Sequence, residues 1–137
     1  TWENATIIEN AGADAEGIVL STFYDEAAPA NDEAASFLTG FKEYLTSIGE
    51  PDVIPAVSAL GYDAYLTLVQ AIKYAGSTDP AAVRDALVNV QVTGVTGDIK
   101  FDENGDADKS LAFIKTVKDG QFQFLKTVSL DDTSAAE

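Results

Sequence analysis

Residues 58–75, SALGYDAYLTLVQAIKYA, decide the fold class of this 137-residue chain. Apolar side chains recur there at helical spacing, and others fill the rest of the helix circumference. The stripe comprises Leu60, Ala64, Leu68, Ala71, Ile72 and Ala75, and the remaining apolar positions are Tyr65, Leu66 and Val69. A helix that is apolar all round is buried on more than one side. The pattern therefore predicts a long helix packed between a sheet and another layer.

The residues before this helix predict a helix, a strand and a second helix. The first helix covers residues 1–10, opens on a Thr1 cap and stops at Gly12. A strand follows within residues 17–24, where a continuous apolar run at 18–20 predicts burial on both faces. The next helix begins at Asn31 or Asp32 and runs to about Ile48.

The residues after the long helix change from helical to strand periodicity. Asp79-Pro80 opens one more helix, in which Val83 and Leu87 are the predicted buried residues. Strands are then predicted at 95–101, 111–118 and 121–128, with Asp119-Gly120 as a tight hairpin turn. The order α-β-α-α-α-β-β-β predicts an α/β fold, with helices on a mixed sheet and a C-terminal β-hairpin. We expect a core of Phe37, Phe41, Leu60, Leu68, Ile72 and Leu87, and a frayed tail at 129–137.

The composition excludes several functional classes. The chain has 23 acidic and 8 basic residues, a formal net charge of −15, and neither His nor Cys. Such acidity repels phosphate backbones, which argues against nucleic-acid binding. Without His and Cys there is no Ser-His-Asp triad, Cys-His pair or common zinc site. A carboxylate mechanism stays open, but no spacing marks a catalytic pair. We therefore predict a protein that is not an enzyme and has no catalytic residues.

The acidic segment 102–108, DENGDAD, has the alternating oxygen ligands of a calcium loop. An EF-hand loop needs Gly at its sixth position and Glu at its twelfth, and this segment has Ala107 and Phe113 there. We predict an acidic turn built on Asn104-Gly105 and no metal site. Gly94, Gly97 and Gly105 lack the nucleotide-binding spacings, so we also predict no cofactor.

Four aromatic residues lie near the ends of predicted elements, where loops commonly build ligand sites: Trp2, Phe23, Tyr24 and Tyr62. A tyrosine there offers an apolar face and one hydroxyl, which suits an amino acid or a similar solute. Ordinary core or rim packing explains the same residues, and the pattern leaves both interpretations open.

Four stretches, taken in order, resemble a known family. They are AEGIV at 15–19 with FYD at 23–25, ALGYDA at 59–64, IKYAGSTDP at 72–80, and GVTGDIKFDENGD at 94–106 followed by VKDGQF at 117–122. Together they resemble the branched-chain amino-acid (Leu/Ile/Val) type of periplasmic solute-binding protein of ABC importers. The resemblance covers residues 1–128 and implies the C-terminal portion of such a receptor, which has the two-lobed type I periplasmic-binding fold.

The resemblance implies a domain organisation and a site. Residues 1–22 would belong to the second lobe, 23–118 to part of the first lobe, and 119–137 to a hairpin arm and tail returning to the second lobe. Only rim positions carry over as ligand-binding candidates, and these are Trp2, Phe23, Tyr24 and Ser58. The groups that hold the solute's carboxylate and ammonium would lie outside these residues.

The same resemblance implies the function and the partners. The chain would be part of an extracytoplasmic receptor, periplasmic or lipid-anchored to the outer face of the cell membrane. It would capture an amino acid or similar small solute for an ABC permease. Two alternatives remain open: a ligand-sensing domain of the same fold that feeds a regulator or signalling protein, and a carboxylate-based enzyme. We expect the isolated chain to form a homo-oligomer, because a C-terminal portion without the rest of the receptor would expose strand edges and apolar surface.

Overall fold

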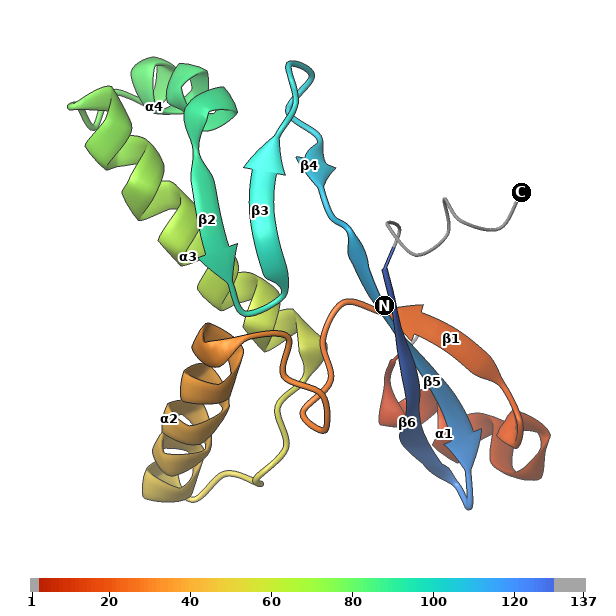
Figure 1. Cartoon of the computed structure of the whole chain (residues 1–137). Helices are drawn as coiled ribbons and strands as arrows, with labels where there is room; N and C mark the ends of the chain where they lie inside the picture. The colour runs from red at the N-terminus through yellow and green to blue at the C-terminus, as the bar shows by residue number, and fades with distance from the viewer. Residues whose placement is uncertain (1–2, 130–137) are drawn as a thin grey trace, which may run out of the picture. The chain divides into compact units, whose positions relative to one another are not determined.

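The computed structural model describes residues 3–129 and divides the chain into two compact units. Unit 1 combines Thr1–Ala28 with Leu111–Glu137, and unit 2 is Pro29–Ser110. Each unit has its own three-stranded antiparallel sheet (Figure 1). The predicted α/β class is confirmed, and so is the C-terminal hairpin, whereas in the described residues the strands form two antiparallel sheets in place of the predicted mixed sheet. The assignment of residues 1–22, 23–118 and 119–137 to two lobes stays a prediction.

Unit 1 joins the two ends of the described chain in one sheet of order β1-β5-β6. β5 lies in the middle and pairs antiparallel with both neighbours. A helix and a 3₁₀ turn precede the first strand (Figure 1). The elements are α1 (Ala5–Ala11), η1 (Gly12–Ala15), β1 (Val19–Thr22), β5 (Leu111–Lys118) and β6 (Gln121–Ser129).

The turn between β5 and β6 has the predicted two-residue form. Asp119 and Gly120 both adopt positive φ, at 54° and 71°, which the tight turns joining antiparallel strands require. The Glu16 carboxylate accepts hydrogen bonds from the backbone N–H of Asp119 at 2.7 Å and of Gly120 at 3.3 Å. The turn is thus held by local backbone geometry and by one distant side chain.

Two predictions for unit 1 need correction. The first helix begins after Asn4, whose side chain accepts from the Thr6 N–H, whereas the predicted cap, Thr1, lies outside the described residues. β1 is not buried on both faces, since Ile18 and Val19 are 42% and 61% exposed. In the described residues β1 has β5 as its single strand neighbour, so its apolar run lies at a sheet edge.

Unit 2 has three helices and a small sheet of order β2-β3-β4 (Figure 1). β3 pairs antiparallel with the strands on both sides. The elements are α2 (Asp32–Ile48), α3 (Ala56–Ala75), α4 (Pro80–Ala86), the 3₁₀ turn η2 (Leu87–Asn89), β2 (Gln91–Gly94), β3 (Gly97–Phe101) and β4 (Ala107–Asp108). No helix within residues 3–129 has the combined length and apolar character needed to cross a membrane.

The helix boundaries in unit 2 follow their caps. Asn31 accepts from the Ala34 N–H at 2.9 Å and starts α2 where predicted, and α2 ends at Ile48. Asp79 accepts from the N–H groups of Ala81 and Ala82 and starts α4, with Pro80 as its first residue. Both cap predictions are confirmed.

The burial of α3 differs from the predicted pattern. Its buried stripe consists of small and polar residues, Ala56, Ala59, Asp63, Thr67 and Ala71. The expected core residues Leu60 and Leu68 are 37% and 51% exposed, and Tyr65 is 65% exposed. Small side chains allow close approach of neighbouring backbones, so α3 presents its small side to the rest of unit 2, while Leu60, Tyr65 and Leu68 are exposed.

The core of unit 2 forms where α3, α4 and β2 meet. Ala71, Val83 and Val90 are buried together, and partly buried Ile72 and Leu87 pack against them. A second cluster joins α2 to α3, in which buried Phe37 stacks on Phe41 with ring centroids 5.2 Å apart and contacts Tyr62 at 5.0 Å. These clusters therefore contain four of the predicted core residues: Ile72, Leu87, Phe37 and Phe41.

The strand predicted at 95–101 is shorter than expected and has an unpredicted partner. It begins at Gly97, because Val95 and Thr96 form the connection from β2, which the sequence pattern missed.

The acidic segment 102–108 forms the expected turn, between β3 and β4. The Asp102 carboxylate accepts from the N–H groups of Asn104 and Asp106, at 2.8 and 2.9 Å.

Candidate functional site

The candidate rim residues fall in both units. Phe23 and Tyr24 follow β1 directly in unit 1, where Phe23 is half-buried and Tyr24 is only 3% exposed. Ser58 lies in the first turn of α3 in unit 2 and is half-buried. Trp2 lies outside the described residues. That these four residues line one solute site stays a prediction.

A buried polar cluster in unit 1 involves the residues on either side of the Phe23–Tyr24 segment. Lys115 Nζ, on β5, lies 2.7 Å from Asp25 Oδ2 and also donates to Glu3 Oε1. The other oxygen of Glu3 accepts from Thr22 Oγ1 at 2.9 Å. We call these four residues, Glu3, Thr22, Asp25 and Lys115, the Lys115 cluster. Its two outer members, Thr22 and Asp25, immediately flank Phe23 and Tyr24.

Lys115 is charged in this setting. Burial by itself lowers the pKa of its ammonium group, but hydrogen bonds to Asp25 and Glu3 outweigh burial and hold the pKa above its ordinary value. The side chains of Lys115, Glu3 and Asp25 are 11%, 18% and 7% exposed. A protonated lysine between two carboxylates is the arrangement in which a buried charge is tolerated.

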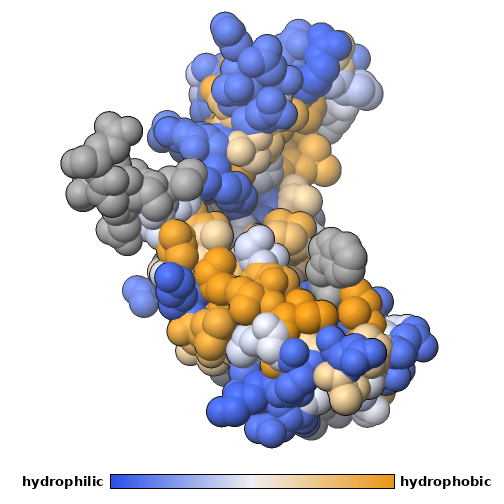
Figure 2. All heavy atoms as spheres, turned by 90° about the vertical axis from the view of Figure 1, so that its right-hand side faces the viewer, coloured by the Kyte–Doolittle hydropathy of each residue, from blue (hydrophilic) through white to orange (hydrophobic). Residues whose placement is uncertain are grey.

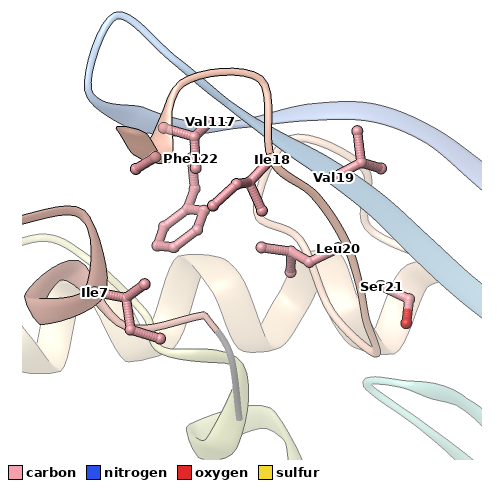
Figure 3. A pocket seen from close by; sticks show the side chains of 8 residues that line it. Ile7, Ile18, Val19, Leu20, Ser21, Val117 and Phe122 are labelled. Carbon is pink, nitrogen blue, oxygen red and sulfur yellow. The ribbon is translucent and has the colours of Figure 1, made fainter. Parts of the chain in front are cut away.

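An apolar pocket of about 320 Å³ opens on unit 1, lined by Ile7, Ala15, Ile18, Val19, Leu20, Ser21, Val117 and Phe122. In Figure 3 the side chains of Ile7, Ile18, Leu20 and Phe122 point toward one another. Figure 2 shows hydrophobic residues gathered in a band across this face. The pocket lining has one polar side chain, Ser21, so it suits apolar contact rather than recognition of an amino acid's charged groups.

Unit 2 contains a second buried polar network, centred on Asp63 of α3. Its carboxylate accepts from the N–H groups of Val95 and Thr96 at 2.6 and 2.9 Å, and from Thr96 Oγ1 at 2.6 Å. Lys109 Nζ donates to Thr96 Oγ1, and burial lowers the pKa of Lys109 despite the opposing charges of Asp63 and Asp98. This network fixes the connection between β2 and β3, which is a structural role.

Tyr62, the remaining aromatic candidate, belongs to the α2–α3 contact. Its hydroxyl donates to Glu33 Oε1 at 2.8 Å, and that bond, together with burial and the charge of Glu33, raises the pKa of Tyr62. The ring contacts Phe37. For Tyr62 the structure therefore shows ordinary packing between two helices.

The described residues 3–129 contain no group of three or more acidic side chains placed to hold a metal ion. The Asp102 carboxylate is engaged by its own turn, where hydrogen bonds from Asp106 and Asn104 lower its pKa. The acidic residues here thus build a turn.

Sequence reasoning missed the Lys115 cluster, although one signal was available. In the run Phe113-Ile114-Lys115-Thr116-Val117, alternation places Lys115 on the same face as Phe113 and Val117. Phe113 and Val117 are 1% and 3% exposed. A lysine at an inward-facing position requires an acidic partner, but Glu3 and Asp25 are too distant in sequence to be identified without the fold.

The described residues have an α/β fold, and comparisons with known proteins give the family. Residues 2–121 match the periplasmic binding protein family. Because the match covers most of the chain, this chain belongs to that family. Family members have the type I periplasmic-binding fold of ABC-transporter solute-binding proteins, and this confirms the resemblance stated from the sequence.

Solved structures support the same assignment. A leucine-binding protein from Thermotoga maritima MSB8 is 36% identical, with a TM-score of 0.75 over 93% of this chain and 35% of that protein. A Desulfitobacterium hafniense ABC transporter substrate-binding protein in complex with Leu is 26% identical, with a TM-score of 0.66 over 88% and 38%. A Brucella ovis leucine-, isoleucine-, valine-, threonine- and alanine-binding protein is 26% identical, with a TM-score of 0.61 over 90% and 34%. This chain thus spans little more than a third of each relative.

Proposed function

We propose that this chain is part of an extracytoplasmic receptor that captures an amino acid, with an apolar side chain such as that of leucine, for an ABC importer. The observation that carries the proposal is the 36% identity to a leucine-binding protein over 93% of this chain. Two further similar structures are of proteins whose names or ligands include leucine. The permease partner and the location outside the cytoplasm are part of the same proposal.

The contribution of this chain to the site is a rim rather than the whole pocket. Phe23 is half-buried beside a buried polar cluster, which suits an aromatic contact with an apolar side chain. The chain spans 35% of the Thermotoga maritima protein, so the remaining residues of such a receptor would supply the groups for the solute's carboxylate and ammonium. A site missing both charged contacts loses several kcal/mol, about a thousandfold or more in affinity.

The test compares two proteins by titration calorimetry with a panel of amino acids. The first is the complete receptor, by which we mean a polypeptide of the relatives' length that carries this chain. The second is the isolated 137-residue chain. We expect micromolar or tighter binding of a branched-chain amino acid by the complete receptor, and binding too weak to detect by the isolated chain. A complete receptor that ignores every amino acid would overturn the proposal.

A further inference from the structure

The Lys115 cluster makes polar contacts to the residues on both sides of the Phe23–Tyr24 segment, Thr22 and Asp25. On one flank Lys115 pairs directly with Asp25 at 2.7 Å. On the other flank it reaches Thr22 through Glu3, which accepts from both Lys115 Nζ and Thr22 Oγ1. A single lysine on β5 therefore fixes both ends of a two-residue segment that follows the edge strand β1.

The restraint continues beyond Asp25. The second carboxylate oxygen of Asp25 accepts from the Ala27 N–H at 2.8 Å, and the Asp25 carbonyl accepts from the Ala28 N–H at 3.2 Å. Unit 1 passes to unit 2 after Ala28. The span from Thr22 to Ala28 thus has contacts to this cluster or its turn at Thr22, Asp25, Ala27 and Ala28.

The fold itself does not need a lysine at this position. Lys115 faces inward between Phe113 and Val117, opposite Leu20 of β1, where apolar side chains in place of Lys115, Glu3 and Asp25 together would need no buried ion pair. Buried ion pairs replaced entirely by apolar residues are commonly neutral or stabilising.

We propose that Lys115 and Glu3 are positioning residues that hold Phe23 and Tyr24 in the conformation required for solute capture. This inference rests on the proposed function. A rim segment that is ordered before the solute arrives does not have to be ordered by it, so the entropic cost of binding falls. The cluster carries two carboxylates and one ammonium group, so loss of Lys115 would leave two buried acidic groups in mutual repulsion.

The first test measures amide hydrogen exchange in the complete receptor without added leucine. In Lys115→Met we expect exchange at residues 22–27 to accelerate at least about tenfold, with a smaller change in the β5–β6 hairpin. Lys115→Arg should keep most of the protection, because it preserves the charge. Lys126→Met is the matched control, since Lys126 is exposed on the adjacent strand. Glu3→Gln, which is less buried, should give the same pattern and decides the result if Lys115→Met fails to fold.

The second test measures leucine affinity of the complete receptor. Lys115→Met and Glu3→Gln should weaken binding by about tenfold, Lys115→Arg should restore it, and Lys126→Met should leave it unchanged. Equal acceleration of exchange throughout unit 1, or no acceleration, would overturn the positioning role, as would unchanged leucine affinity in a receptor that binds leucine. If the wild-type receptor binds no leucine, the proposed function fails, and the exchange pattern alone then decides whether the segment is held by Lys115.

Discussion

The carboxylate of Asp63 can reach the β2–β3 connection because the neighbouring position, Gly94, has no side chain. A Cβ atom at Gly94 would lie 2.5 Å from Asp63 Oδ1, 2.7 Å from Asp63 Cγ and 2.8 Å from Ile99 Cδ1. Asp63 is 3% exposed and accepts three hydrogen bonds, so it has little freedom to move aside. Asp63 on α3 and Gly94 at the end of β2 therefore constrain each other's identity.

Gly94→Ala should lower the free energy of unfolding by about 1–3 kcal/mol, because the methyl group forces the Asp63 carboxylate away from its donors. Gly61→Ala is the matched control. Gly61 lies within α3 with nothing within 4 Å of an added Cβ, and alanine favours helix by about 1 kcal/mol. Urea denaturation followed by circular dichroism measures both. A Gly94→Ala protein as stable as wild type would contradict the account of this contact.

The charge of Lys115 predicts a pH dependence. Its pKa is raised in the folded protein above the ordinary 10.5. The stabilisation it supplies is therefore fully present below about pH 10.5 and is lost as the pH rises through the folded-state pKa. We expect Lys115→Met to be less stable than wild type by about 3 kcal/mol near neutral pH, because two carboxylates lose their partner.

That stability difference should stay constant from about pH 7 to 9.5 and shrink above about pH 10.5. Denaturation curves of wild type and Lys115→Met at a series of pH values give the comparison directly, and Lys126→Met serves as the control for surface charge. A difference that already shrinks between pH 7 and 9 would show that Lys115 is not held in its charged form.

At the scale of elements, the sequence indicated best those helices and strands whose boundaries are set by local chemistry. α2 begins and ends where its Asn31 cap and Gly49 predict, and the Asp119-Gly120 turn aligns β5 with β6. The burial pattern of α3 could not be predicted in the same way. Helical periodicity shows that two faces of α3 are apolar. It does not show that the face carrying Ala59 and Asp63 is the buried one, while Leu60 is exposed.

The candidate site was predictable only in part, for a related reason. Phe23 and Tyr24 could be singled out because they end the strand predicted within residues 17–24. The residues that hold them, Glu3 and Lys115, are 112 positions apart and meet only in the folded sheet. A four-residue strand such as β2, with one apolar residue between polar neighbours, likewise gives too short a pattern to be recognised from the sequence.

Asn31 links two elements, so its substitution separates two effects. Its Oδ1 caps α2 through the Ala34 N–H, and its Nδ2 donates to the Gly94 carbonyl at 2.9 Å. Asn31→Ala should lower the free energy of unfolding by about 1–2 kcal/mol by removing both bonds. Asn31→Asp keeps the cap and loses the donor, so its cost should be intermediate. Equal costs for both substitutions would show that the cap contributes nothing.

At the scale of the whole molecule, large apolar residues remain exposed on both units. Ile18 and Val19 are exposed on unit 1, and Val57, Tyr65 and Leu68 on unit 2. An unpaired strand edge and exposed apolar surface favour association. The net charge of −15 opposes it, but repulsion is screened over about 10 Å at 0.1 M salt, whereas contact burial is not.

We therefore expect the isolated chain to self-associate at micromolar concentration, in part through the edge of β1. Val19→Lys should reduce the mass measured by light scattering, since a lysine on an edge strand hinders pairing. Val88→Lys is the matched control, because Val88 is similarly exposed on η2 and the substitution adds the same charge. A monomeric wild-type chain with cooperative unfolding would contradict this expectation.

We propose that Phe23 and Tyr24 form part of the rim of an amino-acid binding site. The rest of that site would be formed by the part of the related receptors that this chain does not match. The most direct measurement is leucine titration of a chimera, in which this chain replaces the matching 35% of the Thermotoga maritima leucine-binding protein. We expect a folded chimera that binds leucine, and binding that weakens when Phe23 is changed to Ala. A cooperatively folded chimera that does not bind leucine, or an isolated chain that binds it as tightly, would contradict the claim.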